Sequence, residues 1–364
     1  MNWLGNENGP PQVNRDVVVI GGSAGGLDAL TRLVRELPAD FHAAILVVLH
    51  IPAHVPSELH RILARETSLP VAPAVNGELI QPGRIYVASA DRHLMIEDDH
   101  IRLTRGPREN RTRPAIDVLF RSAAYNLGAR VIGVLLSGLL DDGTPGLWAI
   151  KDRGGIALVQ SPDEAFYPSM PESAIEHVRV DAVLPVQELA ATLVEWTQAS
   201  FETEEAAPAS ESMQIEYRIE LEENPLEQGI LRLGPFSSNT CPECHGTMVK
   251  IQEGSIVRFR CHTGHSYSIQ TLLAHVNETI DDHVWSAIRA IDERILVLHQ
   301  MAEMAQREDE TAQCLEQVKL AGERVEVLRQ LVLDTQNLGH NPAELPAQKF
   351  AQEPDTIRRE QVRE

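Results

Sequence analysis

The sequence is poor in cysteine, in aromatic residues and in basic residues, and it has no long apolar run. Its 364 residues include four cysteines, and aromatic side chains make up 4% of the total. Lys and Arg number 32 against 53 Asp and Glu, which gives a formal net charge of -21. Such a chain lacks the positive surface of a general binder of nucleic acids or anionic membranes. No apolar run approaches the ~20 residues that cross a bilayer, so we expect no membrane insertion.

The cysteines and the first residues indicate a location in the cell. Three of the four cysteines fall in one short segment, unlike the spread framework of a secreted disulfide-bonded protein. The opening stretch, MNWLGNENGPPQVNRD, has neither a basic start nor an apolar core, so we expect no signal peptide. Together these features predict a cytoplasmic globular protein with a local metal or redox site.

Residues 16–198 alternate between short apolar runs and helical patterns. Continuous apolar runs of this kind are typical of strands buried on both faces, as in parallel sheets. The alternation predicts a doubly wound, mainly parallel α/β sheet with helices on both faces. The expected strands are 17–20, 44–49, 131–136 and 156–159, the expected helices are 26–37, 56–66, 116–127 and 145–152, and an antiparallel hairpin is expected within 84–104.

The remaining segments are smaller. Residues 1–15 and 338–364 are expected to be disordered tails, and the acid-rich stretch 199–238 is expected to be a linker. From residue 269 to 337, apolar residues recur at spacings of three and four, which predicts two long amphipathic helices in a hairpin or coiled coil. These helices are a candidate homodimer interface, or an intramolecular cover for the rest of the chain.

A serine stands on the turn that follows the first expected strand. The segment VVVIGGSAGGLDAL places Ser23 in a Gly-x-Ser-x-Gly pattern between a strand and a helix. The dinucleotide fingerprint requires glycine where Ser23 stands. The start of a helix offers free backbone N–H groups to an oxyanion. A turn of this composition is also typical of a phosphate cradle, so the motif alone leaves both readings open.

A histidine and an aspartate follow two other expected strands. His50 ends the run AAILVVL, and Asp142 follows VIGVLLSG. Because the carboxyl ends of parallel strands share one edge, Ser23, His50 and Asp142 are expected to meet there. The three residue types match a nucleophile, a general base and an orienting acid. Taken singly, His50 is also compatible with a structural hydrogen bond and Asp142 with a helix cap.

Several separate blocks of residues 16–198 resemble the catalytic domain of the CheB-type chemotaxis methylesterases. The blocks, in chain order, are GSAGG at 22–26, VLHIP at 48–52, RPAIDVLF at 113–120, LSG at 136–138 with Asp142-Gly143, and MPESAI at 170–175. The resemblance implies hydrolysis of glutamyl methyl esters on receptor proteins to glutamate and methanol, and deamidation of receptor glutamines. It implies Ser23 as nucleophile, His50 as general base and Asp142, rather than the adjacent Asp141, as the acid, with no cofactor for catalysis.

The sequence departs from the family pattern in three places. Ala24 stands where many relatives have threonine, and a Gly-Met-Gly turn becomes Gly138-Leu139-Leu140. The well-known members carry an N-terminal phosphoreceiver domain, and the fifteen leading residues are too few for one. We therefore expect no gating by an attached receiver. Two interpretations of Arg113 and Asp117 stay open: they position substrate, or they form a salt bridge or a helix cap.

Residues 239–268 contain a Cys/His cluster. Cys241 and Cys244 form a C-x2-C pair, and Cys261 precedes His265 by four residues. Thiolates and imidazole are the preferred donors of zinc, so these four residues predict a structural zinc knuckle, with His262 as the substitute ligand. A dithiol redox pair is the alternative. The histidines His42, His54, His60, His93 and His100 are expected at the surface.

Three functions fit these observations. The first is a cytoplasmic protein-glutamate methylesterase whose zinc knuckle and helices bind partners. The second is a non-catalytic scaffold of the same fold that binds methyl-accepting receptors or a receptor methyltransferase. The third is a nucleotide-binding or redox protein that uses the glycine turn and the dithiol. The intact set of Ser23, His50 and Asp142 favours the first.

Overall fold

The computed structural model describes residues 12–50, 57–202 and 208–337. The chain forms two compact units, Met1–Leu272 and Leu273–Glu364. The first contains the parallel sheet and the Cys/His segment, and the second contains most of the two C-terminal helices. Of the two expected tails, residues 1–11 and 338–364 lie outside the described residues.

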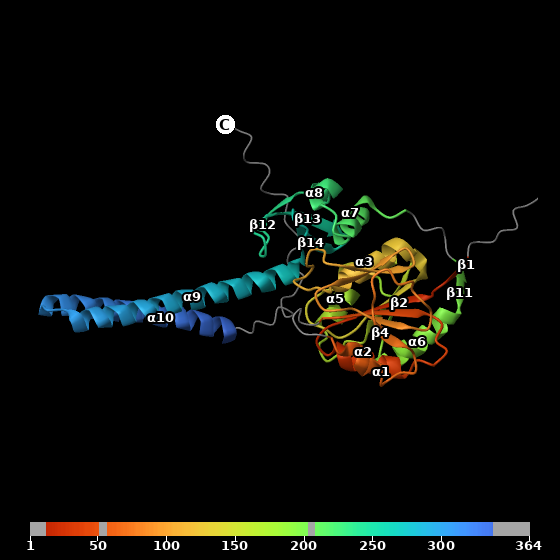
Figure 1. Ribbon diagram of the computed structural model, residues 1–364, viewed down its shortest axis with the longest axis horizontal. Coiled ribbons are helices and arrows are strands. Elements are labelled where there is room, and N and C mark those ends of the chain that lie inside the picture. The colour runs from red at the N-terminus through yellow and green to blue at the C-terminus, as the bar shows by residue number, and fades with distance from the viewer. Residues whose placement is uncertain (1–11, 51–56, 203–207, 338–364) are drawn as a thin grey trace, which may run out of the picture. The chain divides into compact units, whose positions relative to one another are not determined.

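A seven-stranded parallel sheet forms the centre of the first unit (Figure 1). Its order is β10-β9-β8-β2-β3-β5-β4. The strands are β2 (Val17–Gly22), β3 (Ala44–Leu49), β4 (Val71–Pro73), β5 (Ile85–Val87), β8 (Val131–Leu135), β9 (Ile156–Gln160) and β10 (Ala182–Leu184). In the central strand, Val17 lies opposite Ala44 on one side and Val131 on the other. The predicted parallel α/β sheet is confirmed.

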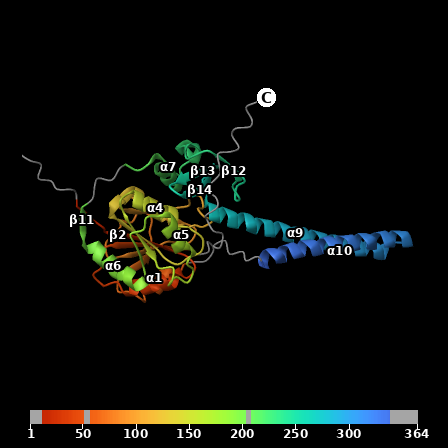
Figure 2. The same ribbon diagram turned by 180° about the vertical axis from the view of Figure 1, so that it is seen from behind.

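Helices cover both faces of the sheet, as Figures 1 and 2 show. Because successive side chains of a strand point to opposite faces, Val17 and Val19 pack with one helix layer and Val18 and Ile20 with the other. The first layer contains α3 (Ile116–Leu127), α4 (Thr144–Asp152) and α5 (Ser169–His177). The second contains α1 (Gly26–Arg35), α2 (Leu59–Leu63) and α6 (Val186–Gln198).

Two small antiparallel pairs accompany the sheet. The predicted hairpin is formed by β6 (His93–Glu97) and β7 (His100–Thr104), while the start of the predicted segment is β5. The strand β1 (Gln12–Asn14) pairs with β11 (Ser200–Glu202), and η1 (Gly128–Arg130) is a short 3-10 helix. Residues 12–14 are therefore ordered strand, which differs from the expected tail.

His93 is buried, which contradicts the expectation of a surface histidine. Its side chain is fully inaccessible, with Nε2 2.9 Å from Pro107 O and Nδ1 accepting from Ala115 N at 3.3 Å. Both ring nitrogens thus have backbone partners, which offsets the loss of water. Burial lowers the pKa of His93 to about 4, so the ring stays neutral.

The expected linker 199–238 is largely folded. Residues Glu211–Glu220 form helix α7, followed by α8 (Pro225–Gln228) and η2 (Ile230–Arg232). The Ser210 side chain caps α7 by accepting from Met213 N at 3.2 Å. The acidic composition was misleading because two of the carboxylates, Glu216 and Glu220, are buried against arginines rather than solvated.

A four-stranded antiparallel sheet carries the cysteines. Its strands are β12 (Phe236–Thr240), β13 (Thr247–Glu253), β14 (Ile256–Cys261) and β15 (Ser266–Ser268), in that order. We call residues 211–268, which comprise α7 and this sheet, the Cys/His module. Its small apolar cluster includes Met248, Phe259 and Tyr267.

The second unit is a pair of long helices, α9 (Ile269–Met304) and α10 (Glu308–Asn337), that lie side by side in both views (Figures 1 and 2). Arg329 Nη2 lies 3.1 Å from Asp292 Oδ2, and Arg294 Nη2 donates to Gln317 Oε1 at 3.1 Å. The helices therefore run antiparallel, as a hairpin. None of the helices in the described part of the chain has the length and hydropathy required of a membrane span.

Candidate functional site

Ser23 lies on a tight turn between β2 and α1. Its backbone N–H donates to Ser137 O at 2.9 Å, which ties the turn to the end of β8. Gly25 has φ +73°, and a Cβ there would lie 2.7 Å from Ser137 Oγ and 2.8 Å from Phe166 Cβ. Glycine is therefore required for both the conformation and the space. The turn holds the Ser23 hydroxyl half-buried at the carboxyl edge of the sheet.

His50 follows β3, the neighbour of β2 in the sheet. Its backbone N–H donates to Gly22 O at 3.2 Å, which continues the pairing of the two strands to the edge. Its Nδ1 lies 3.1 Å from Ser23 Oγ, and its Nε2 lies 2.6 Å from Asp142 Oδ2. The side chain of His50 is 18% exposed and that of Asp142 is 3% exposed. The imidazole thus connects a partly accessible hydroxyl with a buried carboxylate.

Asp142 is surrounded by hydrogen-bond donors. Oδ2 accepts from Ile116 N at 2.8 Å, and Oδ1 accepts from Asp117 N at 3.2 Å and from Asn110 Nδ2 at 3.0 Å. Burial acts to raise the pKa of Asp142, but the hydrogen bond with His50, its charge and the other donors outweigh burial and hold the pKa well below its ordinary value. The group is therefore an anion that orients the imidazole.

Asp141 does not share this role, although it is adjacent. Its Oδ1 accepts from Ser268 Oγ at 2.6 Å and lies 3.4 Å from Thr271 Oγ1. Burial raises the pKa of Asp141 to about 6. The structure therefore brings Asp142, rather than Asp141, to Ser23 and His50.

Arg113 and Asp117 have the structural contacts that the sequence suggested. Arg113 Nη2 lies 2.7 Å from Asp91 Oδ1 and Nη1 donates to Gly106 O at 2.7 Å. Asp117 Oδ1 accepts from Gly143 N at 3.0 Å and from Gly146 N at 2.7 Å, at the start of α4. Burial, followed by the charge of Asp142, raises the pKa of Asp117 well above its ordinary value. Asp117 therefore caps α4.

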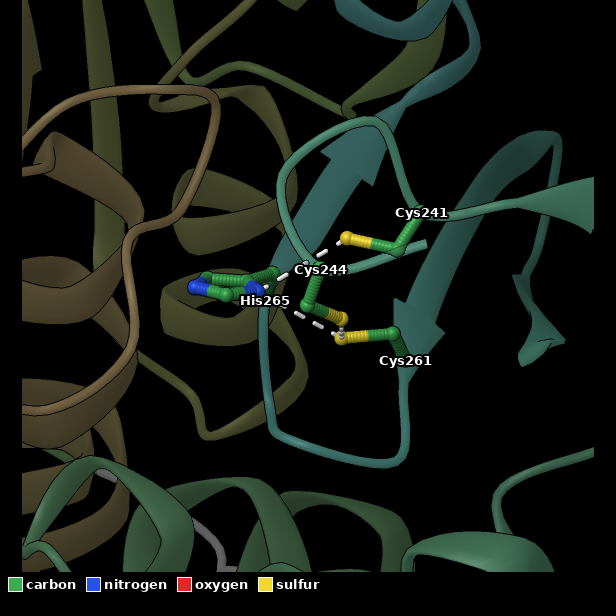
Figure 3. A group of neighbouring side chains, drawn as sticks. All are labelled: Cys241, Cys244, Cys261 and His265. Carbon is green, nitrogen blue, oxygen red and sulfur yellow. Dashed lines mark hydrogen bonds between the residues drawn. The ribbon is translucent and has the colours of Figure 1, made fainter. Parts of the chain in front are cut away.

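The Cys/His module brings its four expected ligands together (Figure 3). The ligand atoms of Cys241, Cys244, Cys261 and His265 all lie within 4.8 Å of one another. The Sγ atoms of Cys244 and Cys261 are 3.6 Å apart, and His265 Nδ1 lies 3.6 Å from the Sγ atoms of both Cys241 and Cys261. His262 is exposed and is not part of this group.

These separations match a tetrahedral metal site. With metal–sulfur bonds of about 2.3 Å and metal–nitrogen bonds of about 2.0 Å, the edges of such a tetrahedron are about 3.5–3.8 Å. Three thiols and one imidazole also supply the donor types that zinc prefers. The residues present therefore fit a zinc-sized ion.

One residue of the site escaped sequence reasoning. Asn110 bridges Asp142 and Asp117 through its amide nitrogen, at 3.0 and 3.1 Å. It stands in the polar stretch RENRTRP, between two runs of ordinary composition. The residue type is the one hint that the sequence offers. Asparagine tolerates the left-handed conformation that it adopts here, with φ +50°, better than most residues do.

A serine, a histidine and an aspartate in hydrogen-bond contact at the carboxyl edge of a parallel α/β sheet form the arrangement of a serine hydrolase. The family model for the CheB methylesterase matches residues 18–193. A relative in Leptospira interrogans, named for protein-glutamate methylesterase and protein-glutamine glutaminase, is 39% identical over 191 residues, which cover 52% of this chain and 99% of the relative. The chain belongs to the CheB methylesterase family.

Two further proteins are similar to about half of this chain. A protein-glutamate methylesterase/protein-glutamine glutaminase of Anaeromyxobacter dehalogenans is 42% identical over 183 residues, or 50% of this chain and 54% of that protein. The crystal structure of the Thermotoga maritima CheB methylesterase catalytic domain is 33% identical, covers 50% of this chain and 97% of that one, and has a TM-score of 0.48. The family match ends before the Cys/His module.

Proposed function

We propose that this protein hydrolyses glutamyl methyl esters on methyl-accepting receptor proteins and deamidates receptor glutamines, through Ser23, His50 and Asp142, in the cytoplasm. The observation that carries the proposal is the continuous hydrogen-bonded path from Ser23 Oγ through His50 to Asp142 Oδ2. The names of the relatives supply the substrate class. A free amide or ester at the end of a glutamyl side chain is an acyl group that an activated serine can attack.

In this mechanism, His50 Nδ1 takes the proton of Ser23 Oγ as the oxygen bonds to the ester carbonyl carbon. The imidazolium then gives the proton to the leaving methoxide, and methanol departs. A water molecule, deprotonated by the same nitrogen, attacks the acyl-enzyme and releases glutamate and the free serine. With a glutamine substrate, ammonia leaves in place of methanol. Asp142 stays ionised and stabilises the imidazolium throughout.

The turn that holds Ser23 supports the tetrahedral intermediate. Helix α1 begins at Gly26, three residues after the serine, so the positive end of its dipole lies beside the developing oxyanion. This support comes from the backbone, which agrees with an alanine at position 24.

Release of methanol from methylated receptor fragments tests the proposal. We expect the full chain to release methanol, and Ser23→Ala to lose at least about 10³-fold in rate while keeping its unfolding temperature. Ser68→Ala, which changes an exposed serine, is the matched control and keeps full activity. A folded parent chain that releases neither methanol nor ammonia, yet binds receptor or methyltransferase, would establish the scaffold function instead.

We also propose that Cys241, Cys244, Cys261 and His265 bind one structural zinc ion. The tetrahedral separations of their ligand atoms support this proposal over a redox dithiol. We expect one zinc per chain by elemental analysis, and less than half of that in Cys261→Ser. Cys314→Ser, in helix α10, is the control and keeps the metal. A reversible Cys241–Cys244 disulfide with no metal would favour the redox alternative.

Finally, we propose that the helical hairpin forms a homodimer. Leu296, Val297, Met301 and Met304 are at least half exposed on α9, so a single hairpin leaves much apolar surface in water. A second copy presents the same surface and covers it. Light scattering is expected to give the mass of a dimer for the full chain and of a monomer for a Leu296→Glu, Val297→Glu variant. A monomeric parent chain at micromolar concentration contradicts the proposal.

A further inference from the structure

The segment 108–110 belongs to two structures at once. It lies in the chain between β7 and α3 of the methylesterase domain, and it also pairs with β15 of the Cys/His module. Ser266 N donates to Arg108 O at 3.2 Å, and Asn110 N donates to Ser266 O at 2.9 Å. The segment therefore extends the sheet of the module by one short strand.

The side chain of Asn110 connects the module to the catalytic carboxylate. Its Oδ1 accepts from Ser268 N at 2.9 Å, while its Nδ2 donates to Asp142 Oδ1 at 3.0 Å and to Asp117 Oδ2 at 3.1 Å. Asn110 is 7% exposed, so water does not replace these partners readily. The amide oxygen of Asn110 thus accepts a hydrogen bond from the module, and its amide nitrogen donates to the methylesterase domain.

A second contact joins the module to the same turn. Ser268 Oγ donates to Asp141 Oδ1 at 2.6 Å and accepts from Thr271 N at 3.0 Å, at the start of α9. Adjacent carboxylates, Asp141 and Asp142, are therefore both reached from residue 268, one directly and one through Asn110.

Buried ion pairs anchor this connection. Arg260 of β14 lies 2.9 Å from Glu109 and 2.8 Å from Glu220, and Glu109 also pairs with Arg121 of α3. Arg258 binds Glu216 through two hydrogen bonds of 2.7 and 2.8 Å. Three arginines and three glutamates are thus buried together, and breaking one such pair leaves an uncompensated charge. This makes movement of the module away from residues 108–110 costly.

We infer that Asn110 is a positioning residue for the catalytic acid and that the Cys/His module holds it in place through Ser268. The inference rests on the proposed role of Asp142. The module is then part of the active centre of this chain, although the match to the family ends before it. Asn110 touches neither Ser23 nor His50 in the contacts above; it acts by fixing the Oδ1 atom of Asp142 and so the direction in which Oδ2 faces the imidazole.

Removal of the Asn110 amide tests the first half. Asn110→Gly keeps the left-handed backbone without strain and deletes only the side chain. We expect kcat to fall about 10- to 100-fold with KM within about twofold, because the acid is misaligned rather than the substrate lost. We also expect the NMR signal of the proton between His50 Nε2 and Asp142 Oδ2 to move from its position in the parent chain, because Asn110 no longer holds the carboxylate.

Asp98→Gly is the matched control. Asp98 is exposed on the turn between β6 and β7 and has a similar φ of +54°. If Asn110→Gly and Asp98→Gly give the same kcat and the same NMR signal for the His50–Asp142 proton as the parent chain, the inference is wrong. If the parent chain has no esterase activity, the proposed function fails, and the NMR signal still tests the positioning of Asp142.

Ser268→Ala tests the second half, with Ser238→Ala on the exposed face of β12 as control. Loss of the Ser268 hydroxyl removes the hydrogen bond from Thr271 N at the start of α9. The backbone N–H of Ser268, which donates to Asn110 Oδ1, is then held less firmly. We expect the NMR signal of the His50–Asp142 proton to move in the same direction as in Asn110→Gly, by a smaller amount, and the double variant to add nothing to Asn110→Gly alone. Full additivity of the two changes would show that Ser268 does not act through Asn110.

Discussion

Two buried polar clusters lie side by side in this protein and differ in the groups that face their carboxylates. The acid cluster comprises Asn110, Asp117, Asp141 and Asp142, and the ion-pair cluster comprises Glu109, Arg121, Glu216, Glu220, Arg258 and Arg260. Two consecutive residues connect the clusters, because Asn110 belongs to the first and Glu109 to the second.

The clusters differ in what neutralises the carboxylates. In the ion-pair cluster, burial acts to raise the pKa of every glutamate. The arginines outweigh burial at Glu109 and Glu216, whose pKa values are lowered, whereas burial prevails at Glu220 and raises its pKa to about 7. In the acid cluster, the His50 imidazole and neutral amide and hydroxyl groups are the donors. There the pKa of Asp142 is lowered, while burial raises that of Asp141 to about 6. Ion pairs with arginine thus hold one region together, and in the other the carboxylate with the lowered pKa is the one that contacts His50.

The largest expected effect comes from neutralising the reactive carboxylate. Asp142→Asn leaves the His50 imidazole without its anionic partner. It also places an NH₂ group where the backbone N–H groups of Ile116 and Asp117 donate, so we expect kcat to fall about 10³- to 10⁴-fold. Methanol release measures it, and Asp152→Asn, at the exposed end of α4, is the control. Activity within tenfold of the parent chain would exclude Asp142 from the mechanism.

A charge deletion in the ion-pair cluster is expected to affect stability instead. Arg260→Met leaves three buried glutamates facing two arginines, so we expect a loss of about 3–5 kcal/mol in the free energy of unfolding. Urea denaturation measures the loss. Arg232→Met is the control, because the Arg232 pair with Glu211 is mostly exposed and is worth no more than about 1 kcal/mol. Equal effects of the two changes would mean that the buried pairs anchor nothing.

The pH dependence of stability distinguishes Asp141 from its neighbour. Because the folded pKa of Asp141 is raised to about 6, its stabilising effect is complete below its unfolded pKa, about 4, and is lost as the pH rises through 6. Asparagine does not ionise, so the Asp141→Asn variant does not lose this stability. The free energy of unfolding of the variant, relative to that of the parent chain, should therefore rise by up to about 3 kcal/mol between pH 4 and pH 8. Chemical denaturation at both pH values measures it.

Asp40→Asn, an exposed substitution, serves as the control for Asp141 and should run parallel to the parent chain. A curve for Asp141→Asn that also runs parallel would show that Asp141 is ionised at its ordinary pKa.

The smallest expected effect concerns the turn that joins Gly138 to Asp141. Leu140 has φ +62°, a left-handed conformation that a branched side chain adopts at a cost. Leu140→Gly is therefore expected to stabilise the protein by about 0.5–1 kcal/mol in thermal unfolding. Leu139 does not have a positive φ, so Leu139→Gly should destabilise the protein by a similar amount. Stabilisation by both changes would indicate relief of crowding rather than of backbone strain.

The meeting of Ser23, His50 and Asp142 could be predicted from the sequence because the topology of the sheet brings them together. Ser23, His50 and Asp142 each follow a buried apolar run, and parallel strands end at a common edge. The cysteine cluster was readable for a similar reason, since its spacing is local. Strands β2, β3, β8 and β9 followed from their apolar runs. Strands β4, β5 and β10 did not, because each is only three residues long, and helices α5 and α6 were not predicted either.

The module's contacts could not be read in this way. Asn110 and Ser268 are separated by 158 positions, and neither lies in a pattern that points to the other. Glu216 and Glu220 were taken for solvated charges because an acidic stretch carries no sign of its distant arginines. His93 was misplaced for the same reason: its burial depends on two backbone groups supplied by a later loop.

The pairing of β1 with β11 has a practical consequence. The first described strand and the last strand of the methylesterase domain are hydrogen-bonded, with Gln12 opposite Glu202, and β1 leads into the start of β2. Ser23 follows the other end of β2, about 20 Å away for a six-residue strand. A fluorescent label attached directly at residue 12 would therefore start behind the edge of the sheet at which Ser23 lies, separated from it by the length of β2.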